Sequence, residues 1–319
     1  MTLLTFGETP LRFEPADGGQ LHTAREMRVY ADGTESNAAA AAATMGGEGV
    51  WVSKLPDTPL GRRVVSEIRR HGVEPAVAWT DGRRQGLRFE EAGVRPRQGT
   101  TLQVRSGSAM AAIEPDDLPM DELRAADAVF TGASTLALSE RAADTATAVF
   151  EATEGTAITA ATDLDLQPGL CSAADARAAL DRLSGAMDVL VANEDDAAAV
   201  LGESGGAREL VTAVAAEFDL EVVVITRSEH GALAMHDTPG TNVVHERAAV
   251  EAETVDPAGG HAAFVGAFLQ RLVDGADTAD ALSYGMAAGA LVRTVPGPYL
   301  TVDRGELDRV VEEAVDEPR

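Results

Sequence analysis

The stretch that decides the fold is TVDPAGGHAAFVGAF, residues 254–268. Gly259–Gly260 stands directly before an apolar run in which Phe264, Phe268 and Leu272 recur every four residues, the spacing of one buried helix face. The glycines allow the backbone to turn tightly into that helix. The first turn of a helix carries free N–H groups and the positive end of the dipole, so this one can hold a phosphate. An ordinary glycine turn into a core helix would produce the same pattern.

Residues 255–268, VDPAGGHAAFVGAF, resemble the C-terminal signature V-D-x-x-G-A-G-D-x-F-x-G-x-F of the PfkB or ribokinase family of carbohydrate kinases. Two positions differ from the signature. His261 replaces the second glycine of the signature, and Ala262 replaces the aspartate that, in the family, takes the proton from the sugar hydroxyl. The resemblance therefore implies a reaction centre at Gly259, Gly260 and His261, with its base missing at Ala262.

The composition excludes several classes of protein. The formal net charge is −26 and Lys54 is the only lysine, which argues against binding to nucleic acids or anionic membranes. The acidic surface is typical of a protein from a salt-rich cytoplasm. Cys171 is the single cysteine, so no internal disulfide is expected, and a passive thiol is the favoured interpretation. No apolar run is long enough to span a membrane, and we expect a cytoplasmic protein.

From residue 114 onward, apolar β-branched runs alternate with helical patterns, which predicts a mainly parallel sheet covered by helices on both faces. The expected strands are 3–6, 128–131, 157–162, 189–191 and 221–226, and the expected helices include the alanine run from Asn37, 140–152 and 173–183. The resemblance implies a ribokinase-like three-layer α/β/α sandwich in one domain over residues 1–319. It also implies a small β-sheet lid formed by about 11–32 and 86–108. The mixture of polar and apolar residues over 11–30 by itself suits short exposed strands.

The N-terminal third contains candidate substrate-binding residues. DGTESN, residues 32–37, resembles the family's sugar-binding signature G-G-A-E-S-N, most closely that of 2-keto-3-deoxygluconate kinases, and it retains Gly33 and Asn37. Asp57 falls where the family has an aspartate near the sugar, although it also suits a turn. Arg105 is suited to a substrate carboxylate, or equally to a surface carboxylate. Other positions differ from the family pattern: Asp32, Arg88, Gln103, Gln167 and Ser228.

The resemblance also implies ATP and Mg²⁺ as cofactors. Similarity to the nucleotide-site motifs places four residues near the nucleotide: Asn193, Thr226, Gly231 and Gly297. Asp196 and Asp256 are the residues expected to help organise Mg²⁺, indirectly.

Two hypotheses follow. The first is a PfkB-type kinase that phosphorylates a hydroxyl of a sugar or 2-keto-3-deoxy sugar acid, with activity weakened by the loss of the base at Ala262. The alternative is a non-catalytic paralogue that binds a nucleotide, a sugar or a partner subunit. His261 would replace the base only if the loop were rebuilt, because adjacent residues point in different directions. The resemblance further suggests a homodimer joined through the lid.

Overall fold

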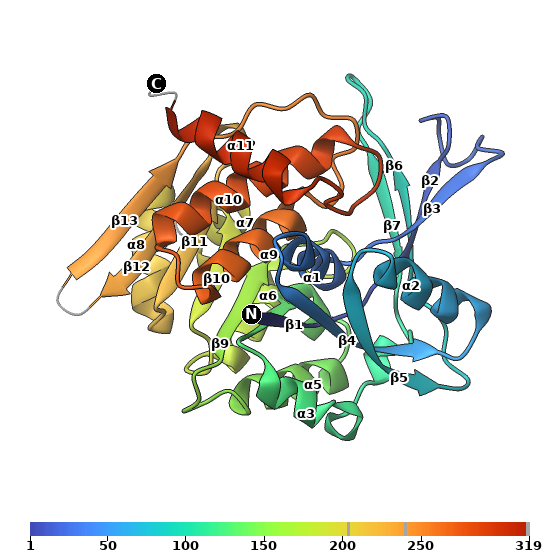
Figure 1. The fold of residues 1–319 in the computed structure, drawn as a ribbon. Helices are drawn as coiled ribbons and strands as arrows, with labels where there is room; N and C mark the ends of the chain where they lie inside the picture. Colours follow the sequence, from blue (N-terminus) through green and yellow to red (C-terminus); the bar gives the residue numbers. More distant parts are fainter. Residues whose placement is uncertain (203–204, 239–240, 317–319) are drawn as a thin grey trace.

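The computed structural model describes residues 1–202, 205–238 and 241–316, which form two sheets and their covering helices (Figure 1). The larger sheet has the order β13-β12-β11-β10-β9-β8-β1-β4-β5. Its strands are β1 (Thr2–Phe6), β4 (Glu48–Pro56), β5 (Val73–Thr80), β8 (Ala128–Gly132), β9 (Thr159–Leu164), β10 (Val189–Asn193), β11 (Val222–Thr226), β12 (Ala232–Thr238) and β13 (Thr241–Arg247). All neighbouring pairs are parallel except β11–β12 and β12–β13.

Helices cover both faces of this sheet, as predicted. One layer contains α1 (Thr34–Thr44), α9 (Gly260–Val273), α10 (Thr278–Leu291) and α11 (Arg304–Asp316). The other contains α3 (Met120–Ala125), α4 (Ala133–Leu136), α5 (Glu140–Glu151), α6 (Ala173–Leu183), α7 (Glu194–Leu201) and α8 (Ala207–Phe218). Alternate residues of β11 enter the two cores, Val224 on the α9 side and Val223 on the α8 side. The three-layer α/β/α architecture is therefore confirmed.

Helix α9 is buried along the stripe that the sequence predicts. Phe268 and Leu269 are fully buried, and Gly266 lies so close to α1 that a Cβ there would stand 2.1 Å from the Ala38 carbonyl oxygen. The helix begins at Gly260, and the residue before it, Gly259, has φ of 77°. A Cβ on Gly259 would also lie 2.1 Å from the Pro298 carbonyl oxygen. Close packing and backbone conformation together require glycine at this turn.

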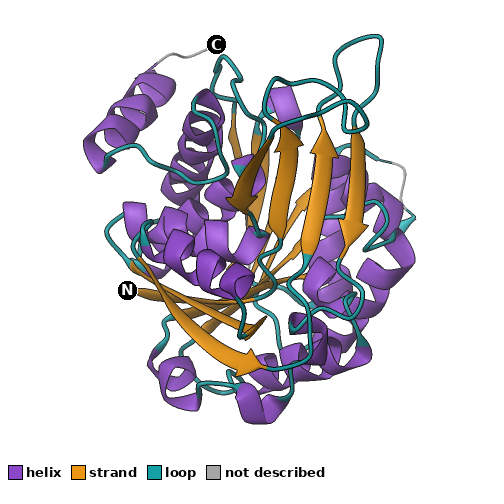
Figure 2. Cartoon of the chain, turned by 90° about the vertical axis from the view of Figure 1, so that its right-hand side faces the viewer, coloured by secondary structure: helices purple, strands orange, loops and turns teal. Residues whose placement is uncertain are grey.

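The smaller sheet, here called the lid, has the order β3-β2-β6-β7, and Figure 2 shows it turned toward the viewer. Its strands are β2 (Leu11–Pro15), β3 (Met27–Ala31), β6 (Leu87–Glu91) and β7 (Thr100–Val104). All four fall within the predicted ranges 11–32 and 86–108. The expectation of exposed strands was wrong for β2, because Leu11 is fully buried and Arg12 is only 2 % exposed. The mixed sequence of β2 reflects a two-faced strand, apolar on one side and charged on the other.

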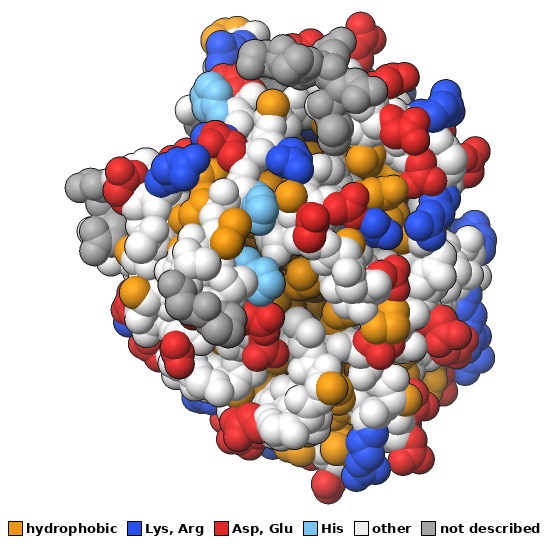
Figure 3. All heavy atoms as spheres, turned by 60° about the vertical axis from the view of Figure 1, so that its left-hand side comes forward, with side chains coloured by type: hydrophobic (Ala, Val, Ile, Leu, Met, Phe, Trp, Pro, Cys, Tyr) orange, Lys and Arg blue, Asp and Glu red, His pale blue; other side chains and the backbone are white. Residues whose placement is uncertain are grey.

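Local boundaries differ slightly from the prediction. Strand β9 lies two residues later than expected, and α1 begins at Thr34, before the alanine run. Helix α2 (Pro59–Arg69) packs against β5. No described helix is long and apolar enough to cross a membrane. On the face shown in Figure 3, acidic side chains are spread widely, with basic ones scattered among them.

Candidate active site

The candidate site lies where the parallel strands end, beneath the lid. Asp163, Asn193 and Thr226 lie at or near the ends of β9, β10 and β11, and residues 7–9 follow β1. Carboxyl ends of parallel strands share one edge of a sheet, which is where open α/β folds bind ligands. Helix α9 begins at the same edge, because the His261 side chain contacts Asp163.

The first turn of α9 is suited to an anion. Gly259, the residue that precedes it, makes no side-chain capping hydrogen bond, and no acidic residue occupies the turn. Its N–H groups are therefore free to meet phosphate oxygens. Ala262, where the resemblance expects the family's base, is 4 % exposed and carries only a methyl group.

His261 is held by a buried carboxylate. Its Nε2 lies 2.9 Å from Oδ2 of Asp163, which is completely buried, whereas the imidazole is 26 % exposed. Burial alone would lower the pKa of His261, but the hydrogen bond and charge of Asp163, with the charges of Asp165 and Asp196, raise it to about 9. Burial raises the pKa of Asp163, and His261 opposes that shift. The two groups therefore form an ion pair at neutral pH.

A second buried carboxylate lies behind this pair. Glu35 Oε1 accepts hydrogen bonds from the Thr135 hydroxyl at 2.5 Å and from the Gly132 N–H at 3.2 Å. Burial is the main cause that raises the pKa of Glu35 to about 7. A Cβ on Gly132 would lie 2.6 Å from Asp163 Oδ1, so glycine leaves room for the carboxylates.

The predicted sugar-binding residues Gly33 and Asn37 lie together at the start of α1. Asn37 Nδ2 donates to Asp32 Oδ1 at 2.8 Å, and Asp32 pairs with Arg88 of the lid at 2.5 Å. A Cβ on Gly33 would lie 2.9 Å from the Thr9 hydroxyl, so the backbone of this segment approaches residues 7–9 closely.

Arg105 is 3 % exposed and is paired with buried Glu8 at 2.5 Å, not with a surface carboxylate. Its Nη1 also donates to Gln167 Oε1 at 3.1 Å. Gln167 Nε2 donates to Asp165 Oδ2 at 3.0 Å, and the Thr34 hydroxyl lies 3.4 Å from the same oxygen. This chain of contacts joins the lid to the region of His261.

Several buried side-chain oxygens around these residues have no hydrogen-bond partner within the described chain. They are Thr9 Oγ1, Asn37 Oδ1, Gln85 Oε1, Gln103 Oε1 and Asp163 Oδ1. Unpaired buried acceptors are costly and require an explanation. A ligand rich in hydroxyl groups would supply the missing donors.

Asp256 connects the segment 254–268 to the lid through Arg12. Its Oδ2 lies 3.3 Å from Arg12 Nη2 and accepts the Gly297 N–H at 3.0 Å, while Oδ1 accepts the Ala258 N–H at 3.0 Å. Burial raises the pKa of Asp256, but the Ala258 N–H and the Arg12 guanidinium more than compensate and hold it below its usual value. Asp256 is thus an ionised anchor for the loop before α9.

A cleft of about 830 Å³ lies next to this loop. It is lined by residues 228–230, residues 249–253 and Arg293. Arg293 also reaches α9, because its Cδ would lie 3.3 Å from a Cβ on Gly260. Thr226 ends β11 just before the first lining segment, and Gly231 follows that segment directly. Two of the predicted nucleotide residues, Thr226 and Gly231, therefore flank a segment that lines the cleft, and Gly297 donates its N–H to Asp256.

Asn193 caps α7, because its Oδ1 accepts the Asp196 N–H at 2.8 Å. Asp196 Oδ2 in turn accepts from the Leu166 N–H at 3.0 Å and from Asn193 Nδ2 at 2.6 Å. Burial raises the pKa of Asp196. The described residues contain no group of three or more His, Cys, Asp or Glu side chains placed to hold a metal ion. A Mg²⁺ ion at this edge of the sheet would therefore need phosphate oxygens and water among its ligands.

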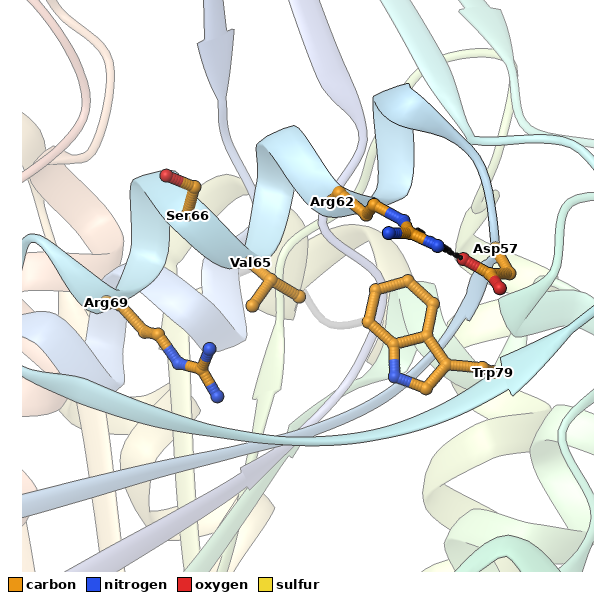
Figure 4. A pocket seen from close by; sticks show the side chains of 6 residues that line it. All are labelled: Asp57, Arg62, Val65, Ser66, Arg69 and Trp79. Carbon is orange, nitrogen blue, oxygen red and sulfur yellow. Dashed lines mark hydrogen bonds and ion pairs between the residues drawn. The ribbon is translucent and has the colours of Figure 1, made fainter.

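Asp57 lies elsewhere, in the turn between β4 and α2 (Figure 4). Its Oδ1 accepts from Arg62 Nε at 3.1 Å and from Arg62 Nη2 at 2.6 Å. With Trp79 and Arg69 it lines a cavity of about 600 Å³ formed by α2, β5 and this turn. The structure therefore places Asp57 apart from the contacts that join Gly33, Asn37 and Arg105.

The structure adds site residues that the sequence did not single out, namely Glu8, Arg12, Glu35 and Asp163. Glu35 stands in the quoted motif DGTESN, and Asp163 directly follows the expected strand 157–162, but the burial of neither was predicted. Glu8 and Arg12 had no sequence signal beyond their charge. Cys171 remains a passive thiol, since burial raises its pKa to about 12.

Comparison with known proteins places this architecture among sugar kinases. Residues 2–304 match the model of the pfkB family of carbohydrate kinases. The chain is 44% identical over 309 residues to a 2-dehydro-3-deoxygalactonokinase of Haloferax volcanii, covering 97% of this chain and 96% of the relative. A crystal structure of 2-dehydro-3-deoxygluconokinase from Thermotoga maritima superposes with a TM-score of 0.86 at 25% identity, covering 98% and 99% of the two chains. A ribokinase II of E. coli in complex with ATP and Mg²⁺ shares the fold, with a TM-score of 0.85 at 17% identity over 98% and 99% of the chains.

Proposed function

Because the chain belongs to the pfkB family of carbohydrate kinases, we propose that it transfers the γ-phosphoryl group of ATP to a hydroxyl of a 2-dehydro-3-deoxy sugar acid. The first candidate is 2-dehydro-3-deoxygalactonate, the sugar acid named in the Haloferax volcanii relative. The observation that carries the proposal is the buried Arg105 beneath the lid, beside acceptors that lack partners. A sugar acid supplies both a carboxylate for a guanidinium and hydroxyl donors for those acceptors.

The residues of the chain divide the work. The first turn of α9 meets the phosphate oxygens, and the cleft beside Arg293 takes the rest of the nucleotide. Mg²⁺, when bound with the phosphates, neutralises the charge that develops on the transferred group. Gly33, Asn37 and Arg105 bind the sugar acid, and the lid excludes water from it. Asp196 and Asp256 act on the metal indirectly, because their oxygens already accept hydrogen bonds from the chain.

Ala262 supports a second candidate function. Its methyl group stands where the family has the base, and a general base typically contributes about 10²- to 10⁴-fold in rate. A chain that binds nucleotide and sugar without turnover would have the same cleft and lid. Preorganised amides at α9 can still stabilise the transferred group, so a base-free kinase would be weak, with some activity remaining.

An assay with 2-dehydro-3-deoxygalactonate and ATP, in which ADP formation is measured from pH 7 to 9.5, separates the two candidates. The kinase produces ADP only when the sugar acid is present. The non-catalytic paralogue binds both ligands in calorimetry and produces none.

The role of Arg105 is tested by the double variant Arg105→Met/Glu8→Gln, which leaves neither buried charge unpaired. We expect KM for the sugar acid to rise by about 10- to 100-fold, which is the loss of affinity that corresponds to one charge-assisted hydrogen bond. KM for ATP should stay unchanged. The matched surface control is Arg62→Met/Asp57→Asn, which should alter neither constant. An unchanged KM for the sugar acid in the Arg105 variant contradicts this assignment.

The lid also supports a homodimer. One face of the lid carries an apolar row that crosses all four strands, formed by Val29, Phe13, Phe89 and Leu102, of which Val29 and Phe13 pack against a buried hydrophobic cluster. The Phe13 and Phe89 rings stack at 5.1 Å, and Leu102 is 53% exposed. A partly exposed apolar row on a sheet is typical of a surface that pairs with another copy.

A further inference from the structure

We propose that His261 accepts the proton of the substrate hydroxyl and that Asp163 is the positioning residue that holds it, so that this pair replaces the carboxylate absent at Ala262. The inference rests on the proposed kinase function and adds a catalytic residue to it. The family signature gives this role to the aspartate that Ala262 replaces, and it has glycine where this chain has His261.

The ring contact sets the tautomer. A carboxylate only accepts hydrogen bonds, so at 2.9 Å from Asp163 Oδ2 the Nε2 atom carries the hydrogen. In the neutral imidazole the lone pair then belongs to Nδ1, which becomes the proton acceptor. An aspartate that fixes the ring and stabilises the imidazolium it becomes is the arrangement of other Asp–His pairs that accept protons from hydroxyl groups.

The imidazole adjoins both of the proposed binding regions. His261 belongs to the first turn of α9, whose N–H groups are proposed to hold the phosphate. Asp165, whose charge acts on the ring, leads to the proposed sugar-acid site. It contacts Thr34 at 3.4 Å and Gln167 at 3.0 Å, and Gln167 contacts Arg105. In this arrangement the substrate hydroxyl would lie beside Nδ1 and face the phosphoryl group that the first turn of α9 would hold.

The surrounding charges favour the protonated product of the transfer. Asp163 and Asp165 face the ring from the end of β9, Asp196 from α7, and Glu35 lies behind Asp163 in α1. Arg293 packs against Gly260, on the first turn of the same helix. The carboxylates raise the pKa of His261 to about 9 against the effect of burial, which makes it a stronger base than free imidazole. Only about 1 % of the ring is neutral at pH 7, so the rate should rise with pH until about 9.

The step is balanced in atoms and charge. The hydroxyl oxygen forms a bond to the γ-phosphorus, and the bond from that phosphorus to the β–γ bridging oxygen breaks, which releases ADP. The hydroxyl proton passes to Nδ1 of His261. The imidazolium then loses a proton to solvent, which it reaches through the exposed part of the ring.

The test compares pH–rate profiles of wild type and variants. His261→Gln keeps a donor for Asp163 but has no basic atom. We expect kcat to fall by about 10²- to 10⁴-fold and the rise toward pH 9 to disappear, while the Kd for ATP changes less than about 3-fold. Asp163→Asn should move the rising limb of the profile toward pH 6 to 7, which loss of structure alone would not do. The control His236→Gln, at a histidine in β12, should retain the wild-type profile.

A carboxylate restored by His261→Gly/Ala262→Asp should give activity without a limb near pH 9. The inference is overturned if His261→Gln retains wild-type kcat, or if the wild-type rate falls as pH rises through 9, because the imidazolium would then be the active form. Failure of the proposed function is distinct, since wild type would then phosphorylate no sugar acid at any pH.

Discussion

Replacing Arg12 by methionine should destabilise the protein far more than replacing an exposed arginine. The Arg12 guanidinium is 2 % exposed and lies 2.7 Å from Glu14, 2.9 Å from Asp32, 3.3 Å from Asp256 and 3.4 Å from Glu90. Methionine keeps much of the apolar stem but leaves these carboxylates facing one another without their cation.

Removing one partner of a buried ion pair typically costs about 3–5 kcal/mol. The lower end applies here, because Asp32 retains Arg88 at 2.5 Å and Asp256 retains two backbone N–H donors. At about 2 °C for each kcal/mol in a chain of this size, the melting temperature should fall by roughly 6–8 °C.

The assay is thermal and urea unfolding of Arg12→Met beside Arg62→Met, whose pair with Asp57 is 67%/46% exposed and should be worth less than about 1 kcal/mol. Adding Asp256→Asn to Arg12→Met should recover part of the loss. The folded pKa of Asp256 lies below its usual value, so its contribution is present above that value and disappears as pH falls through the lowered folded pKa. Equal unfolding free energies for the two arginine variants would refute the reasoning.

Two further predictions concern Glu35 and the lid. Because the pKa of Glu35 is raised from 4.5 to about 7, its ionisation should lower the free energy of unfolding of the wild type by about 3 kcal/mol as pH rises from 4.5 to 8. Glu35→Gln should remove that loss in urea titrations, whereas Glu154→Gln should not, and a pH-independent difference from wild type contradicts the assignment. Leu102→Asp should convert a dimer into a monomer in sedimentation, because a charge would enter the apolar row, while Leu60→Asp on α2 should leave the mass unchanged. A wild-type monomer contradicts the lid interface.

The sequence alone predicted the layers and most of their elements. Runs such as residues 221–226 are β-branched and apolar, so they form strands wherever they are buried, and the period of α9 marks its packed face. Strand β9 ends two residues later than predicted because the charged Asp163 is as deeply buried as the apolar part of the strand. Burial of a polar side chain depends on a partner that lies elsewhere in the chain.

The partners of the charged side chains were decided only by the tertiary structure. Arg12 meets Asp256 across 244 residues, and His261 meets Asp163 across 98. The resemblance implied that a carboxylate is absent at Ala262, and the sequence did not say where the imidazole of His261 would point. Helical periodicity and strand patterns follow from neighbouring residues, so a sequence states them directly. An ion pair forms between whichever charges the completed fold brings within a few ångströms, and that distance exists only after the chain has folded.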